Sequence, residues 1–261
     1  MNNVLNNKNI VLTRPKDQSV QSVIHLERLG ANVICFPTIK ISPIIDNSVL
    51  DETLTNIRNF NSIIFTSVNA VKYFVLRIEK LEVEFNQTNF YVISIGKKTS
   101  DYCKQVGINV NFESSLFTSD SLIKELSNLD LVDKKIIVPS SNLSKPEQYK
   151  TLEKLGAEVT AIPIYRNETN EIDNLTEEID ILKNSEIELF IFTSPSTFYS
   201  FSEIMKIDNY VKYFENKIIA VIGPVTKEAL NKVGIEPNII PQNFSMNYLI
   251  EAITKFYSKE K

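Results

Sequence analysis

The 261-residue chain has few of the residue types that build metal sites, disulfide frameworks and catalytic triads. It has no tryptophan, one histidine and two cysteines. Cys35 and Cys103 fit neither a disulfide framework nor a metal site, so we interpret them as small buried hydrophobic residues. His25 is too isolated for a triad and is interpreted as a structural or surface residue. We therefore expect no metal site.

Glycine is scarce as well, with six residues in all. The turn from Gly96 to Thr99 resembles a phosphate loop, but the full G-x-x-x-x-G-K-[ST] pattern is absent, and so is G-x-G-x-x-G. A nucleotide cofactor is not expected, and we predict a protein that works without a cofactor.

Long apolar runs and long basic runs are both missing. No run approaches the roughly 18 apolar residues of a membrane helix, and the stretch MNNVLNNKNIVLTRP has no signal-peptide core. The net charge is −4, with no basic run that would indicate nucleic-acid binding. We expect a cytoplasmic protein that binds neither nucleic acid nor membrane.

What the chain does contain is a repeat. Residues 218–235, IIAVIGPVTKEALNKVGI, echo residues 89–108, NFYVISIGKKTSDYCKQVGI. All six glycines fall into the repeat as pairs with a nearly constant offset: 156 minus 30 is 126, while 223 minus 96 and 234 minus 107 are both 127. Chance would rarely place every glycine in register, so the repeat indicates an internal duplication.

Each copy alternates apolar strand patterns with helical patterns. Residues 62–75 match residues 188–202, where an apolar strand runs into Thr-Ser, and residues 117–126 match 244–253. This alternation predicts an α/β protein with two parallel-sheet domains of the flavodoxin-like or Rossmann kind. Ligands of such sheets lie beyond the carboxyl ends of the strands, so a cleft between two lobes is the expected site. Residues 36–43 and 161–168 are extended by composition and are expected to join the lobes.

These motifs together resemble the uroporphyrinogen-III synthase family. The resemblance rests on VLTRP near the start, IIFTS, the Ile-Gly turn followed by threonine, LGAEVTAIPIYR, FTSPST and VIGPVTKEAL. It covers residues 10–253, and the order and spacing of the motifs are more specific than any single one.

The resemblance implies two flavodoxin-like lobes joined by a two-stranded β linker. One lobe would combine residues 1–37 with 167–261, and the other would contain residues 38–166. The repeat by itself is equally compatible with a plain split near residue 130.

The resemblance also implies a reaction. The family cyclises the linear tetrapyrrole hydroxymethylbilane to uroporphyrinogen III, with loss of water and inversion of the last pyrrole ring through a spiro intermediate. The enzyme would be a monomeric lyase of tetrapyrrole (haem and sirohaem) biosynthesis. It would receive its substrate by transient hand-over from hydroxymethylbilane synthase.

Tyr165 matches the family tyrosine that is proposed to assist departure of the hydroxyl group. A phenol can donate a hydrogen bond or a proton to a leaving oxygen. The alternative is a linker aromatic residue that packs on a neighbouring helix.

The substrate carries eight carboxylates, and helix N-termini bind anions through free N–H groups and the helix dipole. The candidate substrate-binding residues near helix starts are Ser67, Thr99, Ser194 and Thr226, which form two pairs at equivalent positions of the repeat. Each of them has the alternative role of an ordinary helix cap. Further candidates are the cations Arg14 and Lys98, with Lys97 and Lys145, and each of these has the alternative of a solvated surface charge. The resemblance implies a glycine-rich turn with arginine in many bacterial members, and this chain has PSSNLSKP (139–146) in its place. The sequence therefore does not assign all the groups that would bind the substrate carboxylates.

Two other functions are compatible with the pattern. One is a non-catalytic two-lobed binding protein for small anionic ligands, and the other is a two-domain glycosyltransferase. Stabilisation by a tetrapyrrole but not by a nucleotide sugar would separate them from the synthase.

Overall fold

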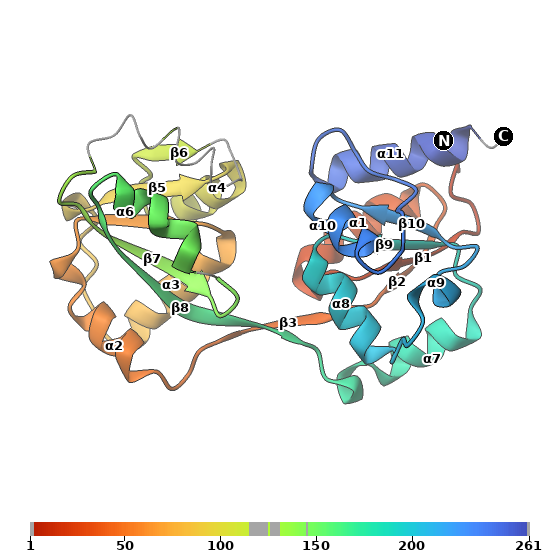
Figure 1. Cartoon of the computed structure of the whole chain (residues 1–261), viewed down its shortest axis with the longest axis horizontal. Coiled ribbons are helices and arrows are strands. Elements are labelled where there is room, and N and C mark those ends of the chain that lie inside the picture. The colour runs from red at the N-terminus through yellow and green to blue at the C-terminus, as the bar shows by residue number, and fades with distance from the viewer. Residues whose placement is uncertain (1–2, 115–124, 126–130, 145, 260–261) are drawn as a thin grey trace. The chain divides into compact units, whose positions relative to one another are not determined.

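The computed structural model describes residues 3–114, 125, 131–144 and 146–259 of the chain. The chain divides into two compact units (Figure 1). The first contains residues 1–40 and 168–261, and the second contains residues 41–167.

The first unit is built on a four-stranded parallel sheet with the order β10-β9-β1-β2. Its strands are β1 (Asn9–Leu12), β2 (Asn32–Cys35), β9 (Leu189–Phe192) and β10 (Ile218–Val221). Its helices are α1 (Lys16–Arg28), η4 (Ile172–Leu175), α7 (Thr176–Asn184), α8 (Pro195–Ile204), α9 (Tyr210–Tyr213), α10 (Pro224–Asn231) and α11 (Met246–Ser258).

The second unit is built on a six-stranded sheet with the order β3-β8-β7-β4-β5-β6. Its strands are β3 (Ile39–Pro43), β4 (Ser62–Phe65), β5 (Tyr91–Ile95), β6 (Phe112–Ser114), β7 (Lys135–Ser141) and β8 (Glu158–Thr169). Its helices are α2 (Ser48–Thr55), η1 (Ile57–Asn59), α3 (Val68–Lys80), η2 (Gln87–Asn89), α4 (Lys97–Gln105), η3 (Pro146–Tyr149) and α6 (Lys150–Lys154). The strands β3 and β8 are neighbours in this sheet, and each contains residues of both units.

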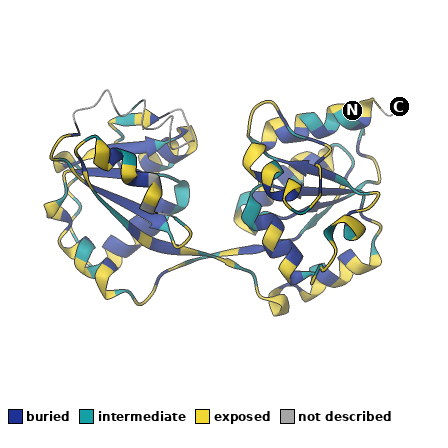
Figure 2. Cartoon of the chain, in the orientation of Figure 1, coloured by how far each residue is buried: buried dark blue, intermediate teal, exposed yellow. Residues whose placement is uncertain are grey.

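Helices pack on both faces of each sheet, which explains why central strands such as β4 and β9 read as nearly continuous apolar runs. In β4, the side chains of Ile63 and Phe65 enter one core cluster, while Ile64 enters another. In β1, Val11 and Ile10 separate in the same way. Figure 2 shows the result in the strands that are buried over most of their length, which are β1, β4, β5, β7, β9 and β10. The α/β class with parallel sheets, expected from the sequence, is confirmed.

The scarce cysteine and histidine residues differ in burial. Cys103 is buried in α4, as predicted, and burial raises the pKa of its thiol to about 11. Cys35 is only half-buried, which corrects the prediction of burial, because β2 is an edge strand of its sheet. His25 is exposed on α1. None of the described helices has the length and apolar character needed to cross a bilayer.

Gly30 ends α1 in the left-handed region, with φ of 96°. A Cβ at this position would lie 3.0 Å from the backbone Cα of Asn6, so both the backbone conformation and the packing favour glycine. Gly107 has a similar φ of 81°, but apart from its chain neighbours no atom of the described residues lies within 4 Å of its Cβ position.

We predict that Gly30→Ala lowers the free energy of unfolding by more than Gly107→Ala does. Both substitutions carry the left-handed strain of roughly 1 kcal/mol, and only the first adds a backbone clash. Urea denaturation of the two variants measures the difference. Equal losses would show that the segment around Asn6 yields without cost.

Candidate functional site

The carboxyl edge of the second unit gathers hydroxyl groups from several elements. Ser67 follows β4 as the N-cap of α3, where its Oγ accepts a hydrogen bond from the Ala70 N–H at 3.1 Å. The same Oγ lies 3.2 Å from the phenolic oxygen of Tyr165. Tyr165 lies on β8, next to Ser141 at the end of β7, where an irregularity shifts the strand register. Three elements therefore converge on one phenol.

Tyr165 is 6% exposed. Its ring stacks on that of Tyr73 from α3, with centroids 5.5 Å apart and an interplanar angle of 20°. Burial raises the pKa of the Tyr165 phenol, and hydrogen bonds with Ser67 and Ser141 act in the opposite direction. The phenol is thus neutral at neutral pH and keeps its proton available for donation. Both interpretations of Tyr165 have a basis in this geometry, because the ring packs on a helix and its hydroxyl reaches the strand edge.

Arg77 fixes the chain segment that enters this region. Its guanidinium donates to the carbonyl oxygens of Ile44 (3.2 Å) and Ile45 (2.9 Å) and pairs with Asp51 at 2.6 Å. The Ile44 N–H in turn donates to the carbonyl of Ile164, the residue before Tyr165. The buried cation therefore ties α3 to the end of β3 and, through it, to β8.

Tyr73 adds a second tie from the same helix. Its hydroxyl donates to the Ile41 carbonyl at 3.0 Å while its ring supports Tyr165. Sequence reasoning did not identify Tyr73, Arg77 or Ser141. The available signal was the i,i+4 spacing of Tyr73 and Arg77 on one face of α3.

The carboxyl edge of the first unit has an equivalent serine. Ser194 is the N-cap of α8, with φ and ψ of −160° and 160°, close to the −161° and 161° of Ser67. Its Oγ accepts from the Thr197 N–H at 3.2 Å and completes a capping box. Its Oγ also lies 2.9 Å from Ser196 Oγ. The cap interpretation therefore holds for both serines, and each hydroxyl also has a second hydroxyl group as a partner.

The two candidate threonines are not caps. Thr99 and Thr226 are the third residues of α4 and α10, whose N-cap positions are the glycines 96 and 223. Both threonines are buried, and neither side chain forms a hydrogen bond with any group in the described part of the chain. In the second unit, α4 follows β5, which pairs with β4, the strand that leads to Ser67. In the first unit, α10 follows β10, which pairs with β9, the strand that leads to Ser194.

The candidate cations differ in their surroundings. Arg14 follows β1, which pairs with β9, and its guanidinium donates to Gln18 Oε1 at 3.0 Å. Burial lowers the pKa of this guanidinium, and the negative charge of Asp17 acts in the opposite direction. Lys98 is exposed and has no ion pair among the described residues. Lys97 pairs with Asp101 at 3.0 Å. Lys145 lies outside the described residues, as does the repeat segment 117–124.

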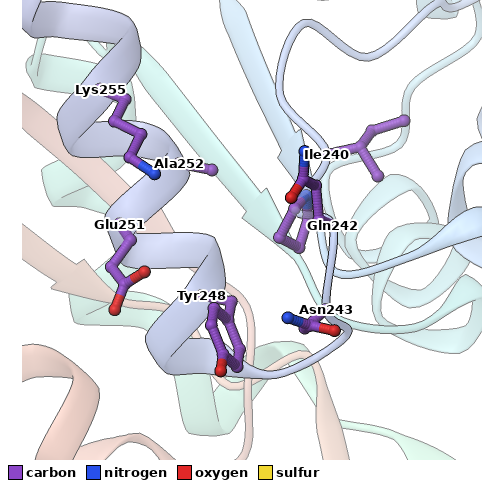
Figure 3. A pocket seen from close by; sticks show the side chains of 8 residues that line it. Ile240, Gln242, Asn243, Tyr248, Glu251, Ala252 and Lys255 are labelled. Carbon is purple, nitrogen blue, oxygen red and sulfur yellow. The ribbon is translucent and has the colours of Figure 1, made fainter.

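A cavity of about 250 Å³ lies in the first unit between α11 and the segment 240–243 (Figure 3). Its lining includes Gln242, Asn243, Tyr248, Glu251 and Lys255. Glu251 and Lys255 carry opposite charges, so the lining offers no net positive charge for the substrate carboxylates, and we do not assign the cavity to the substrate. No group of three or more potential metal ligands occurs among the described residues.

We predict that Arg77→Met lowers the free energy of unfolding by about 2–3 kcal/mol, because two carbonyls and Asp51 lose their partner. The value lies below the range for a fully buried pair, since the side chain of Asp51 is 36% exposed. Arg58→Met is the matched control, because both side chains of its pair with Glu84 are more than three-quarters exposed. Urea denaturation that gave equal losses would contradict a structural role for the buried cation.

Comparison with known proteins agrees with this architecture. The family model described as uroporphyrinogen-III synthase HemD matches residues 21–251. A uroporphyrinogen-III synthase of Chlorobaculum parvum is 26% identical over 250 residues, covering 95% of this chain and 98% of the relative. A putative uroporphyrinogen-III synthase of Methanocaldococcus jannaschii is also 26% identical over 250 residues, covering 94% and 97%.

Two solved structures share the fold. One is the uroporphyrinogen-III synthetase of Helicobacter pylori 26695, with a TM-score of 0.67, 18% identity and coverage of 96% of this chain and 99% of the other. The second is a mutant uroporphyrinogen III synthase of Thermus thermophilus, with a TM-score of 0.67, 14% identity and coverage of 97% and 100%.

Proposed function

The chain belongs to the uroporphyrinogen-III synthase family, and we propose that it cyclises hydroxymethylbilane to uroporphyrinogen III. The reaction would make it a lyase: the terminal hydroxyl leaves as water, and the macrocycle closes with inversion of the last pyrrole ring. The observation that carries the proposal beyond family membership is the buried phenol of Tyr165, held beside Ser67 at the carboxyl edge of a parallel sheet.

Tyr165 is the proposed catalytic residue. Its phenolic O–H donates to the hydroxyl oxygen of the substrate as the C–O bond breaks, so that the leaving group departs as water. Ser67 and the Tyr73 ring hold the phenol in place, which reduces the entropy cost of aligning donor and leaving group. The substrate itself provides the electrons that expel the hydroxyl and the carbon that closes the ring. The proton that the closing pyrrole loses as it becomes aromatic again returns to the Tyr165 phenolate. The reaction therefore balances without an oxidant, a reductant or a cofactor.

The substrate carboxylates are proposed to bind at helix N-termini in each unit. Ser67 and Thr99 stand at the starts of α3 and α4, and Ser194 and Thr226 stand at the starts of α8 and α10. Unpaired N–H groups and the positive end of the helix dipole favour an anion at each position. The hydroxyls of these two buried threonines have no partner among the described groups and would donate to a bound carboxylate.

Arg14 and Lys98 are proposed to add positive charge near these N-termini. Arg14 stands at the end of β1, which pairs with β9. Lys98 is in the first turn of α4, one residue before Thr99.

We also propose that the two units are flavodoxin-like copies of one ancestral domain joined by a linker of β3 and β8. The assignment of residues 1–37 with 167–261 to one lobe and 38–166 to the other belongs to this proposal. Its support is the glycine repeat and the shared backbone conformation of the caps Ser67 and Ser194, which occupy equivalent positions of that repeat.

In this proposal the enzyme works as a monomer in the cytoplasm and receives the bilane directly from hydroxymethylbilane synthase. Direct transfer would limit spontaneous closure of the bilane to the type I isomer. The family match gives no support to the alternative of a non-catalytic anion-binding protein.

An isomer assay tests the reaction. Hydroxymethylbilane is generated in place with its synthase, the protein is added, and the oxidised porphyrins are separated by chromatography. We expect mainly the type III isomer, at a rate proportional to added protein. Type I alone, in the presence of folded protein, would overturn the proposed function.

We predict that Tyr165→Phe lowers kcat by about 10²-fold, the usual contribution of general-acid assistance, with a small effect on KM. Because burial raises the pKa of the phenol, wild-type kcat should stay constant through neutral pH and fall only in alkali beyond the ordinary pKa of tyrosine, as the phenol loses its proton. The variant should lack that fall. Initial rates of type III formation measured across pH give both quantities.

Tyr91→Phe is the matched control, because this tyrosine is exposed on β5 and contributes no described contact to the phenol site. Circular dichroism and urea denaturation establish that each variant is folded. A folded Tyr165→Phe variant with wild-type kcat would remove the phenol from the mechanism while leaving the synthase activity itself in place.

A further inference from the structure

Phe244 is the one phenylalanine in the described part of the chain whose side chain is exposed, at 62%. The others in that part are buried or half-buried in the two units. An exposed phenyl ring leaves apolar surface in contact with water, and burial of that surface would be favourable. A single exposed aromatic ring needs no special explanation by itself, so its position must decide whether it has a function.

The ring stands against Gly223. A Cβ on Gly223 would lie 3.2 Å from Cγ and Cδ1 of Phe244. The φ of Gly223 is −177°, which any residue can adopt, so the backbone does not require glycine here. The missing side chain instead makes room for the phenyl ring. The protein thus holds an exposed ring in a defined place, next to the residue that caps α10.

Strand pairing places this contact at the carboxyl edge of the first sheet. Ile239 bridges Ala220 of β10 in parallel, and the Val221 N–H donates to the Ile239 carbonyl at 2.9 Å. The segment after Ile239 therefore runs past the end of β10, and Phe244 lies there, directly before the Ser245 cap of α11.

The ring consequently lies beside the N-terminus of α10, the position proposed above for a substrate carboxylate. Pro224 has no N–H, so the free donors of the first turn begin at Val225 and Thr226. Thr226 is 2% exposed, and its hydroxyl forms no hydrogen bond with the described groups. An anion site with an exposed aromatic face beside it matches a ligand that carries acidic substituents on an apolar, π-rich ring.

The sequence contains the same pair in the other copy. Gly96 and Phe117 have the same spacing as Gly223 and Phe244, since 117 minus 96 and 244 minus 223 are both 21. Phe117 lies outside the described residues, so only the sequence relation is used here. Gly96 has a φ of 77°, which favours glycine by itself, so only the repeated position of the phenylalanine supports the contact.

We propose that Phe244 is a substrate-contact residue whose ring packs against one pyrrole ring of the tetrapyrrole while an acetate or propionate group of that pyrrole binds the N-terminus of α10. The proposal rests on the proposed synthase function and adds the aromatic half of the recognition. It explains why a glycine with ordinary backbone angles precedes α10.

Steady-state kinetics of Phe244→Ala tests this. Loss of an aromatic contact should raise KM by about 2- to 12-fold with little change in kcat. Phe244→Tyr should restore the wild-type KM, since it keeps the ring. Ile181→Ala is the matched control, because Ile181 is an exposed apolar residue on α7 of the same unit, at 42%, and should leave KM unchanged. Urea denaturation should show near wild-type stability for all three.

Fluorescence titration with uroporphyrin III is the second measurement, because it reports binding without turnover. If the wild type forms the type III isomer and Phe244→Ala matches it in KM and in uroporphyrin affinity, the contact is overturned and the synthase function stands. If the wild type forms only type I, the synthase function is overturned. In that case weaker uroporphyrin binding by Phe244→Ala would still support the aromatic contact, and unchanged binding would overturn it.

Discussion

Burial of both faces of each parallel sheet decides where polar chemistry can lie in this protein. Ile63 and Phe65 pack against helices on one side of β4, and Ile64 packs on the other, so this part of the strand offers no polar surface. Polar side chains then collect where strands end and helices begin. Free N–H groups are present there as well, because the first turn of a helix leaves them unpaired. An apolar core and an edge with free N–H donors are two consequences of one architecture.

The surroundings of Tyr165 combine immobility with retention of the proton. The ring is buried against Tyr73, and burial disfavours the phenolate, so the proton remains on the oxygen. Arg77, the one charged side chain that is buried among the described residues, is neutralised by Asp51 and by backbone carbonyls of Ile44 and Ile45. The positive charge of Arg77 therefore holds the segment around Ile44 and Ile45 in place, and the phenol of Tyr165 stays neutral.

Local patterns made much of the site predictable. An apolar strand that runs into Thr-Ser predicts a capped helix, and Ser67 and Ser194 are such caps in the structure. The alternation of strands and helices predicted parallel sheets, which are confirmed, and the motif order indicated the family that the comparisons establish. The helix starts near Thr99 and Thr226 were also predictable, but the side-chain surroundings of these threonines were not. The role of Tyr165 and of the substrate-binding candidates stays a prediction.

The sequence by itself determined the order of the elements, the repeat and the positions of the caps, because these depend on periodicity and on interactions between residues a few positions apart. Only the tertiary structure decided that Ser67 meets Tyr165, far along the chain, that Arg77 pairs with Asp51, and that Phe244 lies against Gly223. Periodicity shows that a side chain faces a core or an edge. Which partner it meets depends on how strands order in the sheet and how helices pack over it, and many distant residues determine that together.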